Sequence, residues 1–406
     1  MLLGINGMKA TRTIGFIGRF LLVCLVLVVV IEGFIYFQPL PTIQPSITIK
    51  NLPASSALTL PWPNYGQAAI GAQGFGVLAI HGQQKPAPIA SVAKIMTAYA
   101  VLKEKPLQAG QQGPLITITS QDVNVYNDYY AKGGSVARVA AGEQISEYQA
   151  LQAMLLPSAN NFADLLANWA FGSLDNYIIY ANGQAQQLGL SATHITDASG
   201  FSPQTLSSAQ DLVKLGEQAI KNPVIADVAS QQQATIPVAG TVRNINWLLG
   251  VDNVNGIKTG DTDQAGGCFL FSARHAVDGQ NITIIGAIMS APGLNNAVAD
   301  SRPLINSAGQ GFKTIAAVKA GQAVGYYNVP WGGQVLVAAK QDLSLLIWQG
   351  QAVHIATKLN PIHVPSSENE TVGTITVSAG GKLAAIQAIL SQKINNPPLN
   401  WRLFER

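Results

Sequence analysis

The longest apolar run in the chain lies near its N-terminus. Every residue from Phe20 to Ile31 is apolar, and the run continues to Phe37 with a single charged residue, Glu32. A run of roughly 18 such residues spans, or nearly spans, the hydrocarbon core of a bilayer. Basic residues precede the run and none follows it before Lys50, so the charge bias predicts a cytoplasmic N-terminus and an extracytoplasmic remainder. A cleaved signal peptide is the alternative, but the length of the run and the lack of a small-residue cleavage site favour a retained anchor.

Residues 39–63 are rich in Pro, Ser and Thr, which predicts a stalk between the membrane run and a folded domain. Beyond the stalk, short apolar runs predict strands at 68–70, 76–80, 266–274 and 281–290. Apolar residues three and four apart predict helices at 91–105, 145–156, 161–171, 175–188, 209–221 and 295–313. Helices between early and late strands indicate a mixed α/β domain whose sheet joins distant parts of the chain.

From about residue 318 the chain changes to short apolar runs separated by glycines, which is typical of a small β domain. Strands are predicted at 325–327, 335–337, 345–348 and 371–377. The apolar residues of 382–394 fall on one side of a helix, so a terminal helix is predicted there. The tail around Trp401 is expected either to pack against this domain or to touch a membrane interface.

These patterns divide the chain into four parts. The predicted parts are a cytoplasmic stub with a membrane anchor (1–38), a stalk (39–63), an α/β domain (64–316) and a β-rich domain with a terminal helix (317–406).

Composition excludes several classes of function. The net charge is +3 with only 11% charged residues, and no Lys/Arg cluster could neutralise phosphates, so nucleic-acid binding is not expected. Of the two cysteines, Cys24 lies in the membrane run and Cys268 in an apolar strand, so stability is expected to come from the core rather than from a disulfide. The five histidines are scattered without metal-binding spacing, so no metal and no cofactor are expected.

Three short motifs carry the candidate chemistry, and they follow one another as Ser91–Lys94, Ser158–Asn160 and Lys258–Gly260. An isolated S-x-x-K or S-x-N is expected roughly once by chance in a chain of this length, and Ser367–Asn369 is such a background match. Each motif alone also has a bland interpretation, such as a helix cap, a solvated lysine or an exposed strand end. The order, spacing and context of the three together indicate a serine acyltransferase.

The spacing within the motifs suggests how they would act. Ser91 and Lys94 lie one helical turn apart on the same face, so the amine can reach the hydroxyl and activate it without a histidine. The helix N-terminus favours the neutral amine that accepts a proton. Ser158 and Asn160 follow a break between two helices, from which both can point into a cleft. At the start of a late strand, Lys258 and the following threonine can bind a substrate carboxylate.

With their flanking residues, the motifs resemble those of the D-alanyl-D-alanine carboxypeptidases, the low-molecular-mass penicillin-binding proteins. The matching segments are 88–98, 154–161, 188–190, 254–260 and 265–266. The resemblance covers about 68–313 and, more loosely, the C-terminal β domain. It implies an α/β fold with a penicillin-binding-protein/β-lactamase-like catalytic, transpeptidase-like domain. Such a domain has a mainly antiparallel sheet flanked by helices, together with a helical subdomain.

The resemblance also implies a role for each motif residue. Ser91 would attack the carbonyl between the two D-alanines of a peptidoglycan stem pentapeptide, with Lys94 as general base and Ser158 as proton relay. Water would then hydrolyse the acyl-enzyme. The substrate would be bound by Asn160, Lys258, Thr259, Gly260 and Asp261, with the backbone N–H groups of Ser91 and Asp261 forming the oxyanion hole. The expected partners are the stem peptide, covalent β-lactam inhibitors and the cytoplasmic membrane, which the N-terminal helix would bind.

The chain departs from the family pattern at three places. Asp261 stands where members often carry a neutral or basic residue, and its acidic side chain could weaken the binding of a carboxylate. The family often has His-Gly where this chain has Ser199-Gly200. Many members are held to the membrane by a C-terminal amphipathic helix, whereas this chain is expected to use its N-terminal segment.

Other functions share the same motifs. A class A β-lactamase adds a glutamate that activates the deacylating water, but Glu217, the only glutamate between the second and third motifs, has the context of a surface residue. Penicillin is therefore expected to form a long-lived acyl-enzyme. A membrane-tethered penicillin or peptidoglycan sensor is a further alternative, which the absence of a signalling domain before Phe20 disfavours. Transpeptidation, in which an amine replaces water, remains open.

Overall fold

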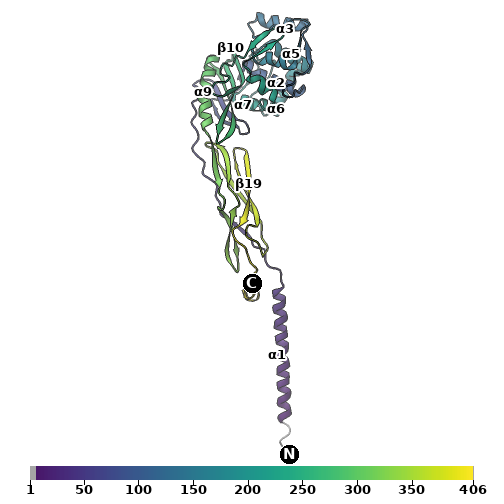
Figure 1. The fold of residues 1–406 in the computed structure, drawn as a ribbon, viewed down its shortest axis with the longest axis vertical. Helices are drawn as coiled ribbons and strands as arrows, with labels where there is room; N and C mark the ends of the chain where they lie inside the picture. The colour runs from purple at the N-terminus through teal and green to yellow at the C-terminus, as the bar shows by residue number, and fades with distance from the viewer. Residues whose placement is uncertain (1–5, 406) are drawn as a thin grey trace, which may run out of the picture.

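The computed structural model describes residues 6–405, with side chains from Phe16 onward. Residues 1–5, the start of the predicted cytoplasmic stub, and residue 406, the end of the predicted C-terminal domain, lie outside the described residues. Helix α1 (Asn6–Tyr36) contains the apolar run, and among the described residues it is the one helix long and apolar enough to cross a membrane. It stands at one end of an elongated molecule (Figure 1).

A five-stranded antiparallel sheet forms the centre of the domain farthest from α1. Its strand order is β10 (Val254–Thr262), β11 (Gly266–Val277), β12 (Gln280–Ala291), β2 (Gln67–Ala72) and β3 (Gly76–His81). The strands predicted at 68–70, 76–80, 266–274 and 281–290 are confirmed. Because β12 pairs with β2, the sheet joins early and late parts of the chain as expected, and β10 is left as an edge strand.

Alternating residues of β11 face two different cores. Phe269 and Phe271 belong to the core shared with α9 (Leu294–Gln310), whereas Cys268 and Leu270 belong to the core shared with α7 (Ala209–Ala219). This period of two is the consequence of strand geometry, in which successive side chains point to opposite faces. The sheet is therefore covered by helices on both faces.

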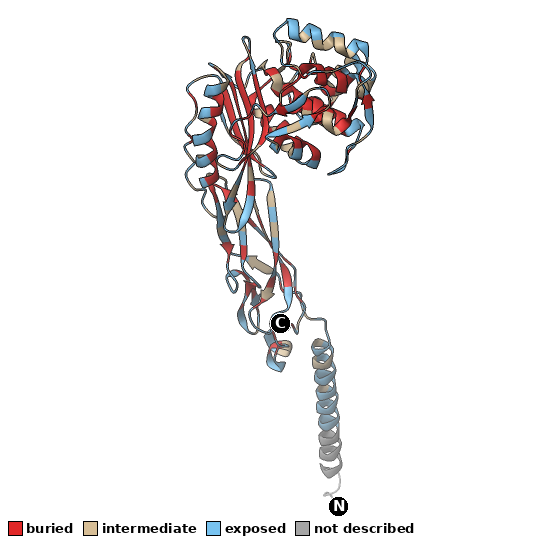
Figure 2. Ribbon diagram, turned by 45° about the horizontal axis from the view of Figure 1, so that its top comes forward, coloured by how far each residue is buried: buried red, intermediate tan, exposed pale blue. Residues whose placement is uncertain are grey.

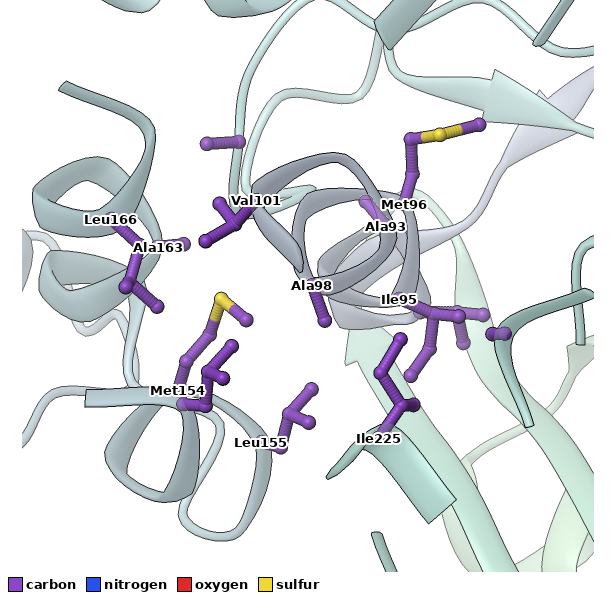
Figure 3. Packing of buried hydrophobic residues seen from close by; sticks show 14 of the residues in the cluster. Ala93, Ile95, Met96, Ala98, Val101, Met154, Leu155, Ala163, Leu166 and Ile225 are labelled. Atoms are coloured by element: carbon purple, nitrogen blue, oxygen red, sulfur yellow. The ribbon is translucent and has the colours of Figure 1, made fainter. Parts of the chain in front are cut away.

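The helical region packs beside α7. It contains the 3-10 turn η1 (Ala90–Ala93), α2 (Lys94–Glu104), α3 (Ser120–Ala131), α4 (Glu147–Leu155), α5 (Asn160–Phe171), α6 (Leu174–Gln187) and α8 (Pro223–Ser230). Val101 of α2 lies toward Ala163 and Leu166 of α5, whereas Ile95 on another side of α2 lies toward Ile225 of α8 (Figure 3). The helices predicted between residues 91 and 313 are confirmed with shifts at their ends, whereas α3 and α8 were not predicted.

Short two-stranded ladders connect the helices. They pair β4 (Ala87–Pro88) with β7 (Leu206–Ser207), β5 (Leu115–Thr117) with β6 (Gln144–Ser146), and β8 (Gln233–Ile236) with β9 (Gly240–Arg243).

The C-terminal part is a β domain with its own core. A six-stranded sheet has the order β1 (Pro45–Ile47), β14 (Ala323–Val329), β15 (Gly333–Ala339), β19 (Lys382–Leu390), β18 (Thr371–Ala379) and β17 (His354–Leu359). β13 (Phe312–Val318) pairs separately with β16 (Leu343–Trp348). The predicted stalk thus supplies the edge strand β1, and its buried Leu60 reaches the core of the five-stranded sheet.

The helix predicted at 382–394 is wrong, because this segment forms β19. Leu383 is exposed while Ile386, Ala388 and Leu390 are buried, so burial alternates with a period of two. β18 and β19 form a hairpin closed by Gly380-Gly381, both with positive φ. Two glycines between strands are a recognised signal for such a turn, and this signal outweighs the helix-like spacing.

The described parts lie in a row. The β domain stands between α1 and the five-stranded sheet, and buried residues concentrate in the sheet and the helices beside it, whereas the described part of α1 is exposed (Figures 1 and 2). The tail turn η2 (Trp401–Glu405) packs against the β domain through Trp401, whose ring lies 4.6 Å from that of Trp331.

Candidate active site

A cleft of about 640 Å³ opens where the edge strand β10 meets the helical region. The residues that line it come from η1, the segment after α3, the start of α5, the loop before β7 and the end of β10. They are Ser91, Lys132, Gly133, Gly134, Ser135, Asn160, Gly200, Phe201, Pro203, Asp261, Thr262, Asp263 and Gln264.

The turn that carries Ser91 is held closely on two sides. Ala90, immediately before Ser91, has φ +46°, a strained conformation for a residue with a side chain. A Cβ on Gly260 of β10 would lie 2.9 Å from the carbonyl oxygen of Ile89, and one on Gly200 would lie 1.8 Å from that of Ala90. Both glycines are therefore required for the approach of their backbones to the turn.

Lys94 is fully buried one turn after Ser91, and its amine has three partners. Nζ lies 2.8 Å from Ser91 Oγ, 2.7 Å from Asn160 Oδ1 and 2.8 Å from the carbonyl oxygen of Ser199. The oxygens of Asn160 and Ser199 can only accept, so a neutral amine donates its two hydrogens to them. Its lone pair then faces Ser91 Oγ, the one partner that can donate a proton.

The surroundings favour the neutral form of this amine. Burial places the pKa of Lys94 well below its usual range, and the nearby charge of Lys258 lowers it further. The carboxylates of Asp197 and Asp164 act in the opposite direction. Desolvation is the largest of these effects, so Lys94 is prepared to accept a proton.

Ser158 lies at the break between α4 and α5 with φ +65°. Its hydroxyl is buried and makes no hydrogen bond within the described protein. Buried hydroxyls are normally paired, so an unpaired one two residues before Asn160, which lines the cleft, is a candidate partner for a bound molecule. Asn160, two residues later, begins α5 and connects the second motif to Lys94.

The third motif lies on β10. Lys258 and Thr259 are buried, and Lys258 Nζ donates to the carbonyl oxygen of Thr259 at 3.0 Å. Burial lowers the pKa of Lys258 to about 7. The carboxylate of Asp261 accepts a hydrogen bond of 3.4 Å from the backbone N–H of Leu294, the first residue of α9. The positive end of a helix thus interacts with the acidic side chain that departs from the family pattern.

The fold therefore brings the three predicted motifs to one place. Ser91, Lys94 and Asn160 are joined by hydrogen bonds, Lys258 acts on Lys94 through its charge, and Gly260 packs against the turn that carries Ser91. The described residues contain no group of three or more His, Cys, Asp or Glu side chains that could hold a metal ion.

The sequence pattern did not reveal the third partner of Lys94, which is a backbone carbonyl. Ser199 was noted only as a departure from the His-Gly of the family. A carbonyl carries no side-chain signature, but Asp197 two residues earlier, in an Asp-x-Ser-Gly loop, is a turn signal that could have drawn attention to this segment.

Similarity to known proteins points to one family. The family model for D-alanyl-D-alanine carboxypeptidase, peptidase family S11, matches residues 69–293. The chain is 27% identical over 303 residues to D-alanyl-D-alanine carboxypeptidase DacA of Escherichia coli (strain K12), covering 72% of this chain and 74% of that one.

Solved structures show the same fold. Penicillin binding protein 5 from Haemophilus influenzae matches with a TM-score of 0.60 at 22% identity, over 84% of this chain and 100% of that chain. The Streptomyces K15 DD-transpeptidase matches with a TM-score of 0.55 at 24% identity, over 62% and 98%. The predicted fold class, with its penicillin-binding-protein-like catalytic domain and small β domain, is confirmed. Because the family model covers more than half of the chain, the protein belongs to the D-alanyl-D-alanine carboxypeptidase family, peptidase family S11.

Proposed function

We propose that the protein is a serine-type D-alanyl-D-alanine carboxypeptidase. It removes the terminal D-alanine from peptidoglycan stem pentapeptides through an acyl-enzyme on Ser91. The observation that carries this proposal is that Lys94 Nζ lies 2.8 Å from Ser91 Oγ and contacts two oxygens that can only accept. When the amine is neutral and donates to those two oxygens, its lone pair is left for Ser91 Oγ. Family membership supports the choice of substrate.

Acylation begins when neutral Lys94 takes the proton of Ser91 Oγ and the oxygen adds to the scissile carbonyl carbon. Backbone N–H groups of Ser91 and Asp261 stabilise the oxyanion. The C–N bond then breaks, and the nitrogen of the leaving D-alanine receives a proton through Ser158, whose hydroxyl has no partner within the described protein. An ester between the shortened peptide and Ser91 remains.

The substrate carboxylate is held at the third motif. Lys258 supplies a positive charge and Thr259 a hydroxyl, while the edge position of β10 allows the peptide to extend the sheet along it. Deacylation follows when water adds to the ester carbonyl, the ester C–O bond breaks and Ser91 regains its proton.

The alternatives differ in the second step. In a β-lactamase, a glutamate would activate the deacylating water, but the carboxylate of Glu217 accepts a hydrogen bond from the backbone N–H of Gly74, in the turn between β2 and β3. This contact favours a structural role for Glu217 and slow loss of a penicillin adduct. A penicillin or peptidoglycan sensor would acylate and not turn over, and a transpeptidase would use an amine in place of water.

The proposal places the catalytic domain outside the cytoplasmic membrane. Helix α1 would be a retained single-pass anchor with the N-terminus in the cytoplasm, which is supported by its length, its exposure and the basic residues before it.

The test measures D-alanine release from a diacyl-Lys-D-Ala-D-Ala peptide together with covalent labelling by a fluorescent penicillin. Wild type is expected to show release and a stable label, and Ser91→Ala should show neither. Ser173→Ala, which changes a helix-capping serine of α6, is the matched control and should retain both. Labelling without release would favour the sensor or a strict transpeptidase, rapid loss of label would favour a β-lactamase, and normal labelling of Ser91→Ala would refute the proposal.

A further inference from the structure

The loop before β7 is organised by one carboxylate, that of Asp197. It accepts hydrogen bonds from three backbone N–H groups and two hydroxyls. The donors are Ser199 N (3.3 Å), Phe201 N (2.9 Å), Ser202 N (3.4 Å), Ser199 Oγ (2.7 Å) and Thr205 Oγ1 (2.5 Å). A carboxylate with so many donors fixes the course of the backbone around it.

The fixed backbone includes the carbonyl that Lys94 uses. Asp197 holds the N–H of Ser199 and the N–H of Phe201, which lie on either side of the Ser199–Gly200 peptide unit. The carbonyl of this unit accepts from Lys94 Nζ at 2.8 Å. The preceding carbonyl, of Ala198, accepts from the hydroxyl of Thr97 on α2 at 2.6 Å, so the loop is bound to the helix at two successive residues.

We propose that Asp197 is a positioning residue for the general base. By fixing the Ser199 carbonyl, it occupies one N–H of Lys94 and so keeps the lone pair of the amine directed at Ser91 Oγ. This inference rests on the proposed function, because it takes Lys94 as the base. It assigns a role to a side chain that touches neither the substrate nor the reacting atoms.

The charge of Asp197 gives this role a measurable signature. The charged groups that act on Lys94 are Lys258 from β10, which lowers its pKa, and Asp164 from α5 and Asp197, which raise it. Asp197 itself acts on Asp164 and on the hydroxyls of Tyr129 and Tyr177, all of whose pKa values are raised, mainly by burial. Removing the charge of Asp197 therefore lowers the pKa of Lys94.

The test uses Asp197→Asn in the full-length, detergent-solubilised protein. Asparagine keeps the shape but replaces one acceptor oxygen by a donor and removes the charge. The acylation rate constant for a fluorescent penicillin is measured across pH and divided by the fraction of protein that can be labelled at saturation. We expect the plateau rate to fall about tenfold to a hundredfold. This is part of the rate enhancement that a well-placed general base contributes, because the variant keeps Lys94 but positions it less well. The rising limb of the profile should move to lower pH, because less alkaline conditions then suffice to deprotonate Lys94.

Asp211→Asn is the matched control. The carboxylate of Asp211 also fixes a loop, by accepting from Ala192 N at 2.7 Å and Thr193 Oγ1 at 3.2 Å, but it is not among the groups that act on Lys94. Its variant should lose thermal stability while the labelled fraction keeps the wild-type rate and pH limb. If Asp197→Asn behaves in the same way, its role is structural only and the inference is wrong.

A second variant covers the case in which Asp197→Asn does not fold. Ser199→Ala removes one of the five hydrogen bonds to Asp197 and leaves both the charge and the carbonyl in place. We expect a smaller fall in the plateau rate, with the pH limb near its wild-type position, and a wild-type plateau would contradict the inference. The proposed function fails separately, if wild type is not labelled at Ser91 or if its rate does not rise with pH.

Discussion

Two buried lysines with lowered pKa values lie at the centre of the site, and they need opposite charge states. In the proposed mechanism, Lys94 must be neutral to take a proton, whereas Lys258 must be charged to hold a carboxylate. Burial lowers both pKa values, and the charge of Lys258 adds to the effect at Lys94. Repulsion between the two ammonium groups therefore favours the state in which Lys94 is neutral and Lys258 is charged, because neutralising Lys94 makes it easier to keep Lys258 charged.

This arrangement predicts a bell-shaped pH profile for the peptide substrate. The rate should rise with pH as Lys94 loses its proton, and kcat/KM should fall as the pH passes about 7 and Lys258 becomes neutral. A peptide whose terminal carboxylate is replaced by an amide is the control, because its weak reaction does not need the charge of Lys258. We expect the falling limb with the carboxylate peptide only, and an identical limb with both peptides would contradict the role of Lys258.

At the residue scale, the sequence could reveal side chains but not the backbone groups around them. Ser91, Lys94 and Asn160 carry chemistry that a motif shows, and their hydrogen bonds place them together. The carbonyl of Ser199 belongs to any residue type, and only the course of the loop decides where it points. The same holds for Ser158, whose hydroxyl without a partner is a property of its surroundings.

At the scale of elements, the site depends on how closely β10 approaches η1. Gly260 leaves no space for a side chain, since a Cβ would also lie 3.0 Å from Ser91 N and 3.1 Å from Ala90 Cβ. The glycine of the third motif therefore acts through packing. It sets the distance between β10, which carries Lys258 and Thr259, and the turn that carries Ser91.

Gly260→Ala should separate these two elements. Because misplacement by about 1 Å can reduce a rate about a hundredfold, we expect acylation by penicillin to slow by at least about tenfold, with Ser91 and Lys94 both present. Gly183→Ala is the control, since Gly183 lies within α6 and a Cβ there would meet no atom within 4 Å. That variant should retain wild-type acylation and gain slightly in helix stability. A wild-type rate for Gly260→Ala would contradict this prediction, because it would show that the contact between β10 and the turn of Ser91 can accommodate a side chain at residue 260.

The errors of prediction also belong to this scale. β19 has apolar residues whose spacing fits a helix, but the Gly380-Gly381 turn before it and its pairing with β15 and β18 decide in favour of a strand. Helix α3 buries no residue completely, so it shows no apolar stripe, but its capping box between Thr119 and Asp122 was a readable signal. Helix α8 likewise begins with Asn222 as a cap followed by Pro223.

At the scale of the whole molecule, the β domain lies between α1 and the five-stranded sheet with its helices (Figure 1), and the cleft that Ser91 lines lies in that distant part. The segment 39–63 runs along this domain, because β1 pairs with β14 and Leu52 bridges to Val353. The C-terminal tail also lies at the end of the β domain next to α1, where Arg402 donates to the carbonyl oxygen of Tyr36, the last residue of that helix, at 2.8 Å. Composition indicated a stalk, but contacts between residues so far apart in sequence follow only from the folded sheet.

The position of α1 leads to a final prediction, that the helix is retained as an anchor. The apolar part, Phe16–Tyr36, would be about 31 Å long, which matches the hydrocarbon core of a bilayer. The intact mass of the membrane-extracted protein should therefore include this segment, and the protein should stay with membranes after washing with alkaline carbonate. Replacing Val26 and Val29 by arginine costs about 5–7 kcal/mol of insertion free energy and should abolish membrane retention, whereas replacing both by leucine should not. A mature chain that begins after Phe37 would identify the segment as a cleaved signal instead. Contacts of the β domain, and not α1, would then have to keep the protein at its site of action.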